Sequence, residues 1–234
     1  MTVKRLLLYV ALVVLAAYGA ITSYPGILFS ASRGYNNITL YSRLPLNELT
    51  DKLLARVYDA LAAEEFFDPG RKLEIYLTGG YGEYRFFAPF CGRSYSCAHP
   101  VSNKVFIASA DPGKDLAYDP SGRGAPRILE SVMVHELAKA QVKNKLGALK
   151  YLAAADWKKD GYAEHLARET GDMNSADICG EWNRNDLLKR YLEYRLMAEL
   201  LKYEDGIGYA ALMTENISYE SVRTRVLNKY CKRL

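Results

Sequence analysis

The hydrophobic pattern begins with a long uncharged apolar stretch close to the N-terminus. Lys4 and Arg5 precede residues 6–32, which carry no charge, and the apolar centre of this stretch is 6–21. A segment that is apolar on every side is typical of a membrane span or a secretory signal, not of the core helix of a globular domain. The two basic residues predict that the N-terminus faces the cytoplasm and that the rest of the chain lies outside it.

Two interpretations of this segment stay open. A cleaved signal peptide has the same charged start and apolar core, but no Ala-x-Ala cleavage site follows, which favours an uncleaved anchor. We therefore divide the chain into residues 1–32, a signal anchor or signal peptide, and residues 33–234, the exported domain. That domain is expected to be periplasmic or extracellular, and it would be secreted if the segment is cleaved.

Beyond a polar connector at 30–43, the pattern becomes that of a globular domain. Three short runs rich in β-branched and aromatic residues predict strands at 73–77, 84–88 and 105–108. Before them, apolar residues at three- and four-residue spacing predict a helix that opens at Pro45 and buries one face. That face consists of Leu46, Leu49, Leu53, Val57, Ala60 and Leu61.

The second half of the domain has a helical pattern throughout. After a long connection at 111–126, which is rich in proline and glycine, helices are predicted at 127–147, 157–170, 184–204 and 218–232. Gly147 and Gly171 are expected to end the first two of these helices. Strands followed by helices predict one domain of the α+β class, with a small sheet and a helical half.

Composition and charge narrow the function classes. The net charge is only +4, and no dense run of Lys and Arg occurs, so a nucleic-acid partner is not expected. No Gly-rich loop opens a helix after a strand, which argues against nucleotide chemistry. Export makes disulfides between the four cysteines plausible; three connectivities are open, and Cys91 and Cys97 are close enough for a local bridge.

The strongest chemical signal lies in the helix predicted at 127–147. It contains His135-Glu136-Leu137-Ala138-Lys139. In zinc peptidases two histidines at this spacing bind the metal, and the glutamate between them takes a proton from the metal-bound water. Here a lysine stands where the second histidine would be, so the short motif is altered.

A second segment, 157–164 (Trp-Lys-Lys-Asp-Gly-Tyr-Ala-Glu), follows it. Together the two segments resemble the gluzincin metallopeptidases, in which HExxH is followed by a helix with a Trp-x-x-Glu-Gly-x-Ala pattern. The resemblance implies a gluzincin-like architecture, a peptide substrate and zinc as the cofactor, if any is bound. It also implies roles for individual residues: His135 as the first ligand, Glu136 as the general base, Lys139 and Asp160 in place of the second and third ligands, and Trp157, Gly161 and Ala163 as packing positions.

The two departures from the pattern fit each other chemically. An ammonium must lose a proton with a pKa near 10.4 before it can bind zinc, and Asp160 is one methylene shorter than the expected glutamate. Together the changes should abolish the usual coordination. A cation at Lys139 facing Glu136 and Asp160 would instead replace the charge of the metal with an ion pair. The hypothesis is a pseudoenzyme.

A working site with other ligands is the alternative. Glu164 lies one helical turn beyond Asp160 and shares its face, and His99 could approach from its loop, whereas His165 should point about 140° away from Asp160. Tyr194, like Tyr191, is a weaker candidate for stabilising an oxyanion, with core packing as its other role.

These observations favour a membrane-anchored extracytoplasmic metallopeptidase homologue with a degenerate zinc site. Its expected partners are the membrane, through the N-terminal helix, and a peptide or protein that it binds without cleaving. The first alternative is an active zinc metallopeptidase with unusual ligands. The second is a structural or interaction protein of the cell envelope whose resemblance to gluzincins is accidental.

Overall fold

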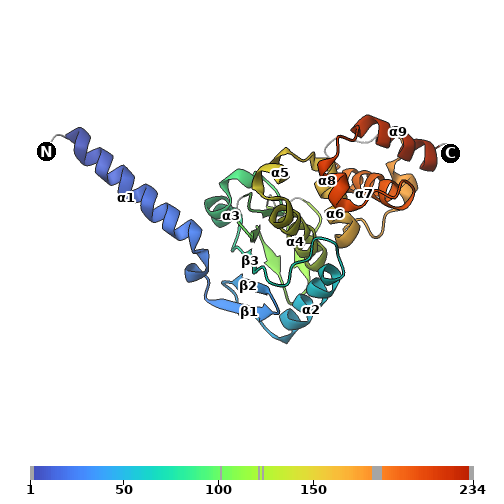
Figure 1. Cartoon of the computed structure of the whole chain (residues 1–234). Helices are drawn as coiled ribbons and strands as arrows, with labels where there is room; N and C mark the ends of the chain where they lie inside the picture. Colours follow the sequence, from blue (N-terminus) through green and yellow to red (C-terminus); the bar gives the residue numbers. More distant parts are fainter. Residues whose placement is uncertain (1–2, 101, 121, 123, 181–185, 232–234) are drawn as a thin grey trace.

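An apolar helix projects from an α+β body (Figure 1). The structure is a computed structural model, and it describes residues 3–231 except 101, 121, 123 and 181–185. Helix α1, Val3–Ser23, has no buried residue, and among the described helices it alone has the length and apolar composition to cross a membrane. The N-terminal segment therefore has the character of a signal or anchor helix, as the sequence predicts.

The body is built on a five-stranded sheet with the order β1-β2-β3-β5-β4. Strands β2, β3 and β5 are parallel to one another, while β1 and β4 run antiparallel at the two edges. The bounds are β1 Ala31–Tyr35, β2 Ile38–Ser42, β3 Leu73–Leu77, β4 Ser96–Ala98 and β5 Lys104–Ile107. A smaller sheet consists of β6 Ala110–Asp111, β7 Leu116–Ala117 and β8 Arg127–Ile128.

The two faces of the main sheet are covered by different elements. Ile38, Leu40 and Ile75 belong to the core that includes helices α2, Glu48–Ala62, and α4, Leu129–Leu146. The opposite face carries Tyr76 and Phe106, which pack against helix α3, Tyr81–Phe87, and against the residues that follow α1. Because alternate residues of a strand point to opposite faces, one sheet supports both cores.

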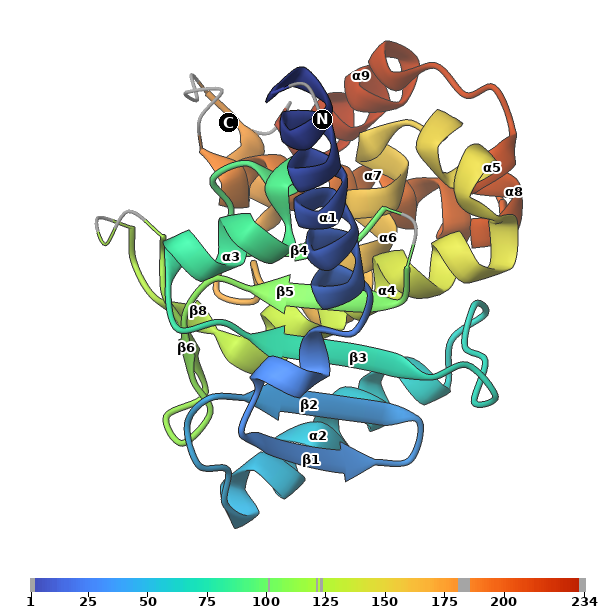
Figure 2. The ribbon, with the colours of Figure 1, turned by 90° about the vertical axis from the view of Figure 1, so that its left-hand side faces the viewer.

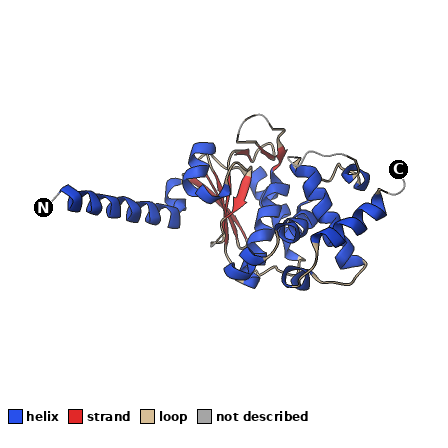
Figure 3. Ribbon diagram, turned by 90° about the horizontal axis from the view of Figure 1, so that it is seen from above, coloured by secondary structure: helices blue, strands red, loops and turns tan. Residues whose placement is uncertain are grey.

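The helical half lies on one side of the strands (Figure 3). Its remaining helices are α5 Ala148–Ala153, α6 Asp156–Ala167, α7 Leu187–Tyr203, α8 Tyr209–Thr214 and α9 Tyr219–Tyr230, and short 3-10 turns are η1 Pro25–Leu28, η2 Pro89–Cys91 and η3 Ser175–Ile178. The α+β class and the predicted strands at 73–77 and 105–108 are confirmed. The helices predicted from the sequence correspond to α2, α4, α6, α7 and α9, although 184–185 and 232 lie outside the described residues.

Several local predictions were wrong. Residues 84–87 belong to α3, and Ala88 follows it, so this run is not a strand; Tyr84 and Phe87, one turn apart, both pack on the sheet. The connector at 30–43 forms β1 and β2. Strand β1 is mostly exposed, and the alternating buried positions of β2 include a serine, so neither strand stands out as apolar in the sequence. Helix α2 begins later than Pro45 because the Asn47 side chain caps it. Gly147 does end α4, but Arg168 in the left-handed conformation, not Gly171, ends α6.

Two disulfides join the four cysteines. Cys91–Cys97 is the local bridge that the spacing allowed, and Cys179–Cys231 ties the end of η3 to the end of α9. Disulfides persist in oxidising compartments, so both are compatible with an extracytoplasmic location of the body.

Helices α6 and α7 approach each other closely at Gly161. A Cβ atom placed there would lie well inside contact distance of the Tyr194 carbonyl oxygen. We expect Gly161→Ala to lower the free energy of unfolding by about 1–3 kcal/mol, since the two backbones must separate. Gly82→Ala is the matched control, because a Cβ atom at this position of α3 meets nothing within 4 Å. Urea unfolding of both variants checks this, and an equal effect in both would contradict the close approach.

Candidate functional site

The two segments singled out in the sequence lie against each other at the contact of α4 and α6. His135 is one turn from Lys139 on α4, and Asp160 is one turn from Glu164 on α6. The His135 side chain is 1% exposed, with Nε2 3.6 Å from Asp160 Oδ1 and Nδ1 3.8 Å from Glu164 Oε2. The sequence therefore identified a real cluster of buried charged groups.

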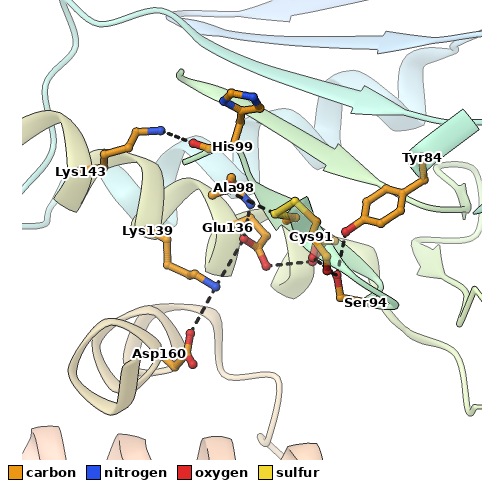
Figure 4. The surroundings of a disulfide bond; sticks show 11 residues. Tyr84, Cys91, Ser94, Ala98, His99, Glu136, Lys139, Lys143 and Asp160 are labelled. Carbon is orange, nitrogen blue, oxygen red and sulfur yellow. Dashed lines mark hydrogen bonds and ion pairs between the residues drawn. A yellow bond between two sulfur atoms is a disulfide. The ribbon is translucent and has the colours of Figure 1, made fainter. Parts of the chain in front are cut away.

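Lys139 lies between two carboxylates (Figure 4). Its Nζ atom is 3.2 Å from Asp160 Oδ1 and 3.6 Å from Glu136 Oε2, so both ion pairs expected from the sequence are present. Burial alone lowers the pKa of Lys139, but the charges of Glu136 and Asp160 outweigh it and raise the pKa well above its usual value. Burial likewise opposes ionisation of Asp160, yet Lys139 and His135 hold its pKa well below the ordinary range. The ammonium form of Lys139 is thus strongly favoured.

Lys143 shows the effect of burial on the pKa of a lysine that is not paired with a carboxylate. It lies one turn beyond Lys139 on α4, and its Nζ donates to the His99 carbonyl at 2.6 Å and to the Ser102 carbonyl. Burial, with no carboxylate to oppose it, lowers the pKa of Lys143 to about 8. Two lysines on one helix are therefore shifted in opposite directions by their partners.

The carboxylate of Glu136 is held by the edge strand β4. Its Oε1 accepts a hydrogen bond from the Ser96 hydroxyl at 3.0 Å, and its Oε2 accepts one from the Ala98 N–H at 2.7 Å. Lys139 also contacts Oε2. Both oxygens of Glu136, the residue for which the resemblance implies the role of general base, thus have partners within the protein.

Further charged residues, which sequence reasoning missed, complete the cluster. Glu169 Oε1 lies 3.1 Å from His135 Nδ1, and Arg127 Nη1 lies 3.1 Å from Glu169 Oε2.

Glu164 Oε1 accepts hydrogen bonds from the N–H and the hydroxyl of Thr170, at 2.8 and 2.7 Å, and Arg195 is 3.9 Å away. The left-handed turn that ends α6 brings 169–170 back towards its last turn. The helix predicted at 157–170 includes both residues, so the sequence pattern could not show that they return to the site from a turn.

The charges of the cluster balance without a metal. Burial opposes protonation of His135, but Tyr191, Asp160, Glu164 and Glu169 together raise its pKa well above the usual value. Four cations, the protonated His135 among them, then face four carboxylates, so the sum is zero. The cations are His135, Lys139, Arg127 and Arg195, and the carboxylates are Glu136, Asp160, Glu164 and Glu169. The Tyr191 ring stacks on the His135 ring, with centroids 4.7 Å apart.

One subset of these residues has the geometry of a metal site. Ligand atoms of His135, Glu164 and Glu169 lie within 4.8 Å of one another, and one nitrogen with two carboxylate oxygens suits zinc. Both ring nitrogens of His135 and Glu164 Oε2 are buried and lack a hydrogen bond of good geometry, although carboxylate oxygens lie 3.1–3.8 Å from the two nitrogens; this arrangement fits the donor set of a metal. Arg127 and Arg195 contact the same two carboxylates, however, and supply positive charge that a metal would otherwise supply.

The other candidate residues are placed elsewhere. His99 follows β4, its ring lies 6.5 Å from that of Phe106, and Figure 4 shows it directed away from Asp160. The structure therefore does not bring His99 to the ligand positions, although Glu164 is there. His165 pairs with Glu199 at 2.9 Å, as its angle on the helix predicts. The ring of Tyr194 packs edge-on against that of Tyr219, so it is Tyr191 that reaches the site.

Substitution of Lys139 should leave the charges of Glu136 and Asp160 without the cation that neutralises them. We expect Lys139→Met to lower the free energy of unfolding by about 3 kcal/mol, the lower end of the cost of breaking a buried ion pair, because the Lys139 side chain is 20% exposed. Lys145→Met, an exposed position on the same helix, is the control and should change stability little. Urea unfolding of the full chain in detergent micelles measures both. Equal stability of the two variants would contradict a structural role for the ion pair.

Stability should be highest between about pH 5 and 6.5. The pKa of Asp160 and that of Glu164 are lowered in the folded state, so their contribution is present above the ordinary carboxyl pKa of about 4 and is lost as the pH falls below it. The pKa of His135 is raised, so its contribution is complete below about 6.5 and is lost as the pH rises through the folded-state value.

Urea unfolding over a series of pH values checks this prediction, with His135→Gln as the comparison. The variant should lose less stability than the parent on the alkaline side, since it lacks the group that titrates there. A decline of equal size in both proteins would show that His135 is not protonated in the folded state.

Comparison with known proteins gives no family assignment. No protein-family model, no curated protein and no solved structure matches this chain. The function is therefore inferred from the geometry of the α4–α6 contact, in which a histidine, a lysine and four carboxylates, two of them on the motif positions 136 and 160, meet in one buried cluster.

Proposed function

We propose that this protein is a membrane-anchored, extracytoplasmic homologue of the gluzincin metallopeptidases in which an ion pair replaces the zinc. In this proposal it binds peptide or protein segments without cleaving them. The observation that carries it is the position of the Lys139 ammonium, within ion-pair distance of Asp160 and Glu136 at once. These are the motif positions that supply a zinc ligand and the general base in the gluzincin pattern.

The electrostatics of the site support loss of the metal. Zinc binding at this position would require Lys139 to lose its proton, and the two carboxylates raise the pKa of Lys139 well above its usual value. A divalent ion added beside protonated His135, Lys139, Arg127 and Arg195 would leave the cluster with excess positive charge, which is costly in a buried place. An ion pair is therefore the better match to these residues.

The hydrogen bonds of Glu136 support loss of catalysis. A general base needs a lone pair directed at the proton that it takes, with the donor about 2.6–3.2 Å away. In this protein each oxygen of Glu136 already accepts one hydrogen bond, from Ser96 or Ala98, and Oε2 also contacts Lys139, so fewer of its lone pairs are free for a substrate water. The carboxylate thus connects α4 to β4 and contributes to the structure of the site.

The binding role is inferred from what surrounds the ion pair. The side chains of Lys139 and Asp160 are 20% and 19% exposed, so solvent and a ligand can reach them. Strand β4 forms the edge of the main sheet beside the site. Edge strands bind extended peptides through backbone hydrogen bonds, although the Ala98 N–H of β4 is already bonded to Glu136. A peptide carbonyl or carboxylate would also find a cation in Lys139.

An active metalloenzyme is the second candidate, and the grouping of His135, Glu164 and Glu169 favours it. A metal held there would displace the contacts of Arg127 and Arg195 with the two glutamates. It would supply a Lewis acid, with zinc as the best match to one imidazole and two carboxylates.

Metal analysis of the purified full-length protein separates the two candidates. We expect less than stoichiometric zinc after purification without chelator, and no difference between the parent and His135→Ala. The opposite result is one zinc per chain in the parent and its loss in both His135→Ala and Glu169→Gln. That result would contradict the pseudoenzyme proposal and support the active metalloenzyme.

A gain of zinc should follow if the missing ligands are restored. The double substitution Lys139→His with Asp160→Glu places an imidazole one turn from His135 and lengthens the third ligand, so we expect stoichiometric zinc binding. Lys145→His with Asp160→Glu is the control, since Lys145 is exposed on the same helix. If neither double variant gains metal, the gluzincin-like arrangement of α4 and α6 is not supported.

A further inference from the structure

Exposed apolar side chains gather at the end of the body from which α1 leaves. Tyr24 and Ile27 follow α1 and are 73% and 75% exposed, while Phe90 in η2 is 81% exposed and Phe86 in α3 is 41% exposed. We call these four side chains the aromatic face. Large exposed apolar groups that lie together mark a surface that meets another apolar phase.

The aromatic face is in contact with the apolar helix. The Tyr18 hydroxyl of α1 donates a hydrogen bond to the Phe86 carbonyl at 2.8 Å, and the two rings meet edge-on with centroids 5.2 Å apart. Figure 2 shows α3 beside α1, on the side of the sheet that carries η1. The body is therefore fixed against the last turns of α1 at α3.

The length of α1 sets the depth of this contact. Its 21 residues span about 31 Å at 1.5 Å per residue, close to the thickness of a bilayer's hydrocarbon core, about 30 Å. Tyr18 lies five residues before the end of the helix, which is about 7–8 Å along its axis. If α1 spans the membrane, the Phe86 carbonyl, bonded to Tyr18, must lie at or below the level of the lipid headgroups.

Cationic and aromatic side chains border the same face. The guanidinium groups of Arg85 and Arg93 lie 5.9 and 5.8 Å from the centroid of the Tyr81 ring. A cavity of about 550 Å³ beside the end of α1 is lined by Lys72 and Lys104, together with Glu74 and the aromatic side chains Tyr24, Tyr41 and Tyr76. Aromatic residues are enriched at membrane interfaces, and basic residues near the surface are attracted to anionic lipids.

We propose that the aromatic face rests in the interface of the membrane that α1 crosses. The body is then docked on the lipid through α3 and η2 and is not a freely moving domain on a tether. The partner is an anionic bilayer, which matches the apolar side chains with acyl chains and the basic ones with phosphates. The Cys91–Cys97 disulfide ties η2 to β4 and keeps the docked segment fixed to the sheet. This proposal rests on the retention of α1 as an anchor, and it does not depend on the state of the α4–α6 site.

Tryptophan fluorescence in lipid nanodiscs tests the docking. The full-length protein is reconstituted in phosphatidylcholine with phosphatidylglycerol, and its intact mass is measured first to establish that α1 is retained. Phe90→Trp is the probe, because Phe90 lies far along the chain from α1 and reaches lipid only if the body docks. Leu49→Trp is the matched control, an exposed apolar position on α2, across the sheet from η1 and α3. Unsubstituted protein gives the signal of the two native tryptophans.

We expect lipid brominated near the top of its acyl chains to remove most of the emission that Phe90→Trp adds, and little of that added by Leu49→Trp. The added emission of Phe90→Trp should also lie at shorter wavelength. If neither added tryptophan is quenched, the face is in water and open to a protein partner, which overturns the proposal. Quenching of both to the same extent, or a chain that lacks α1, overturns it as well. Thermal unfolding of both variants shows that the substitutions leave the fold intact.

Discussion

The arrangement of the helical half depends on how four buried or half-buried carboxylates are neutralised. Glu136, Asp160, Glu164 and Glu169 come from α4, α6 and the turn after α6, and like charges at this separation would push these elements apart. Lysine, arginine and histidine side chains from α4, α7 and β8 face them. The packing of α6 between α4 and α7 is therefore an electrostatic arrangement as well as an apolar one, and the close approach at Gly161 allows it.

Part of this structure follows from the sequence alone. The spacing of His135, Lys139, Asp160 and Glu164 places each pair on one helix face, and the resulting ion pairs of Lys139 are present. Helical periodicity identified the long helices because one turn repeats many times within each of them. The sequence also predicted an N-terminal apolar helix within 6–32 and allowed a local Cys91–Cys97 bridge, and both are present.

Other features of the fold and of the site depend on tertiary contacts and could not be predicted from local sequence patterns. Residues 84–88 have the composition of a strand, but their position after Gly80 and against Phe106 decides in favour of helix α3. Arg127 and Glu169 fall within the helices predicted at 127–147 and 157–170, whereas they reach the cluster from a short strand and from the left-handed turn after α6. Their contribution to the charge balance depends on tertiary contacts, which leave no trace in the local pattern.

The link between Glu136 and β4 has a consequence for how changes at the site spread through the body. Because the Glu136 carboxylate of α4 is bonded to Ser96 and Ala98, a change that moves this carboxylate also acts on the edge strand. The strand is in turn tied by Cys97 to Cys91 in η2. One carboxylate, one short strand and one disulfide thus form a continuous mechanical connection from the α4–α6 contact to the segment that follows α3.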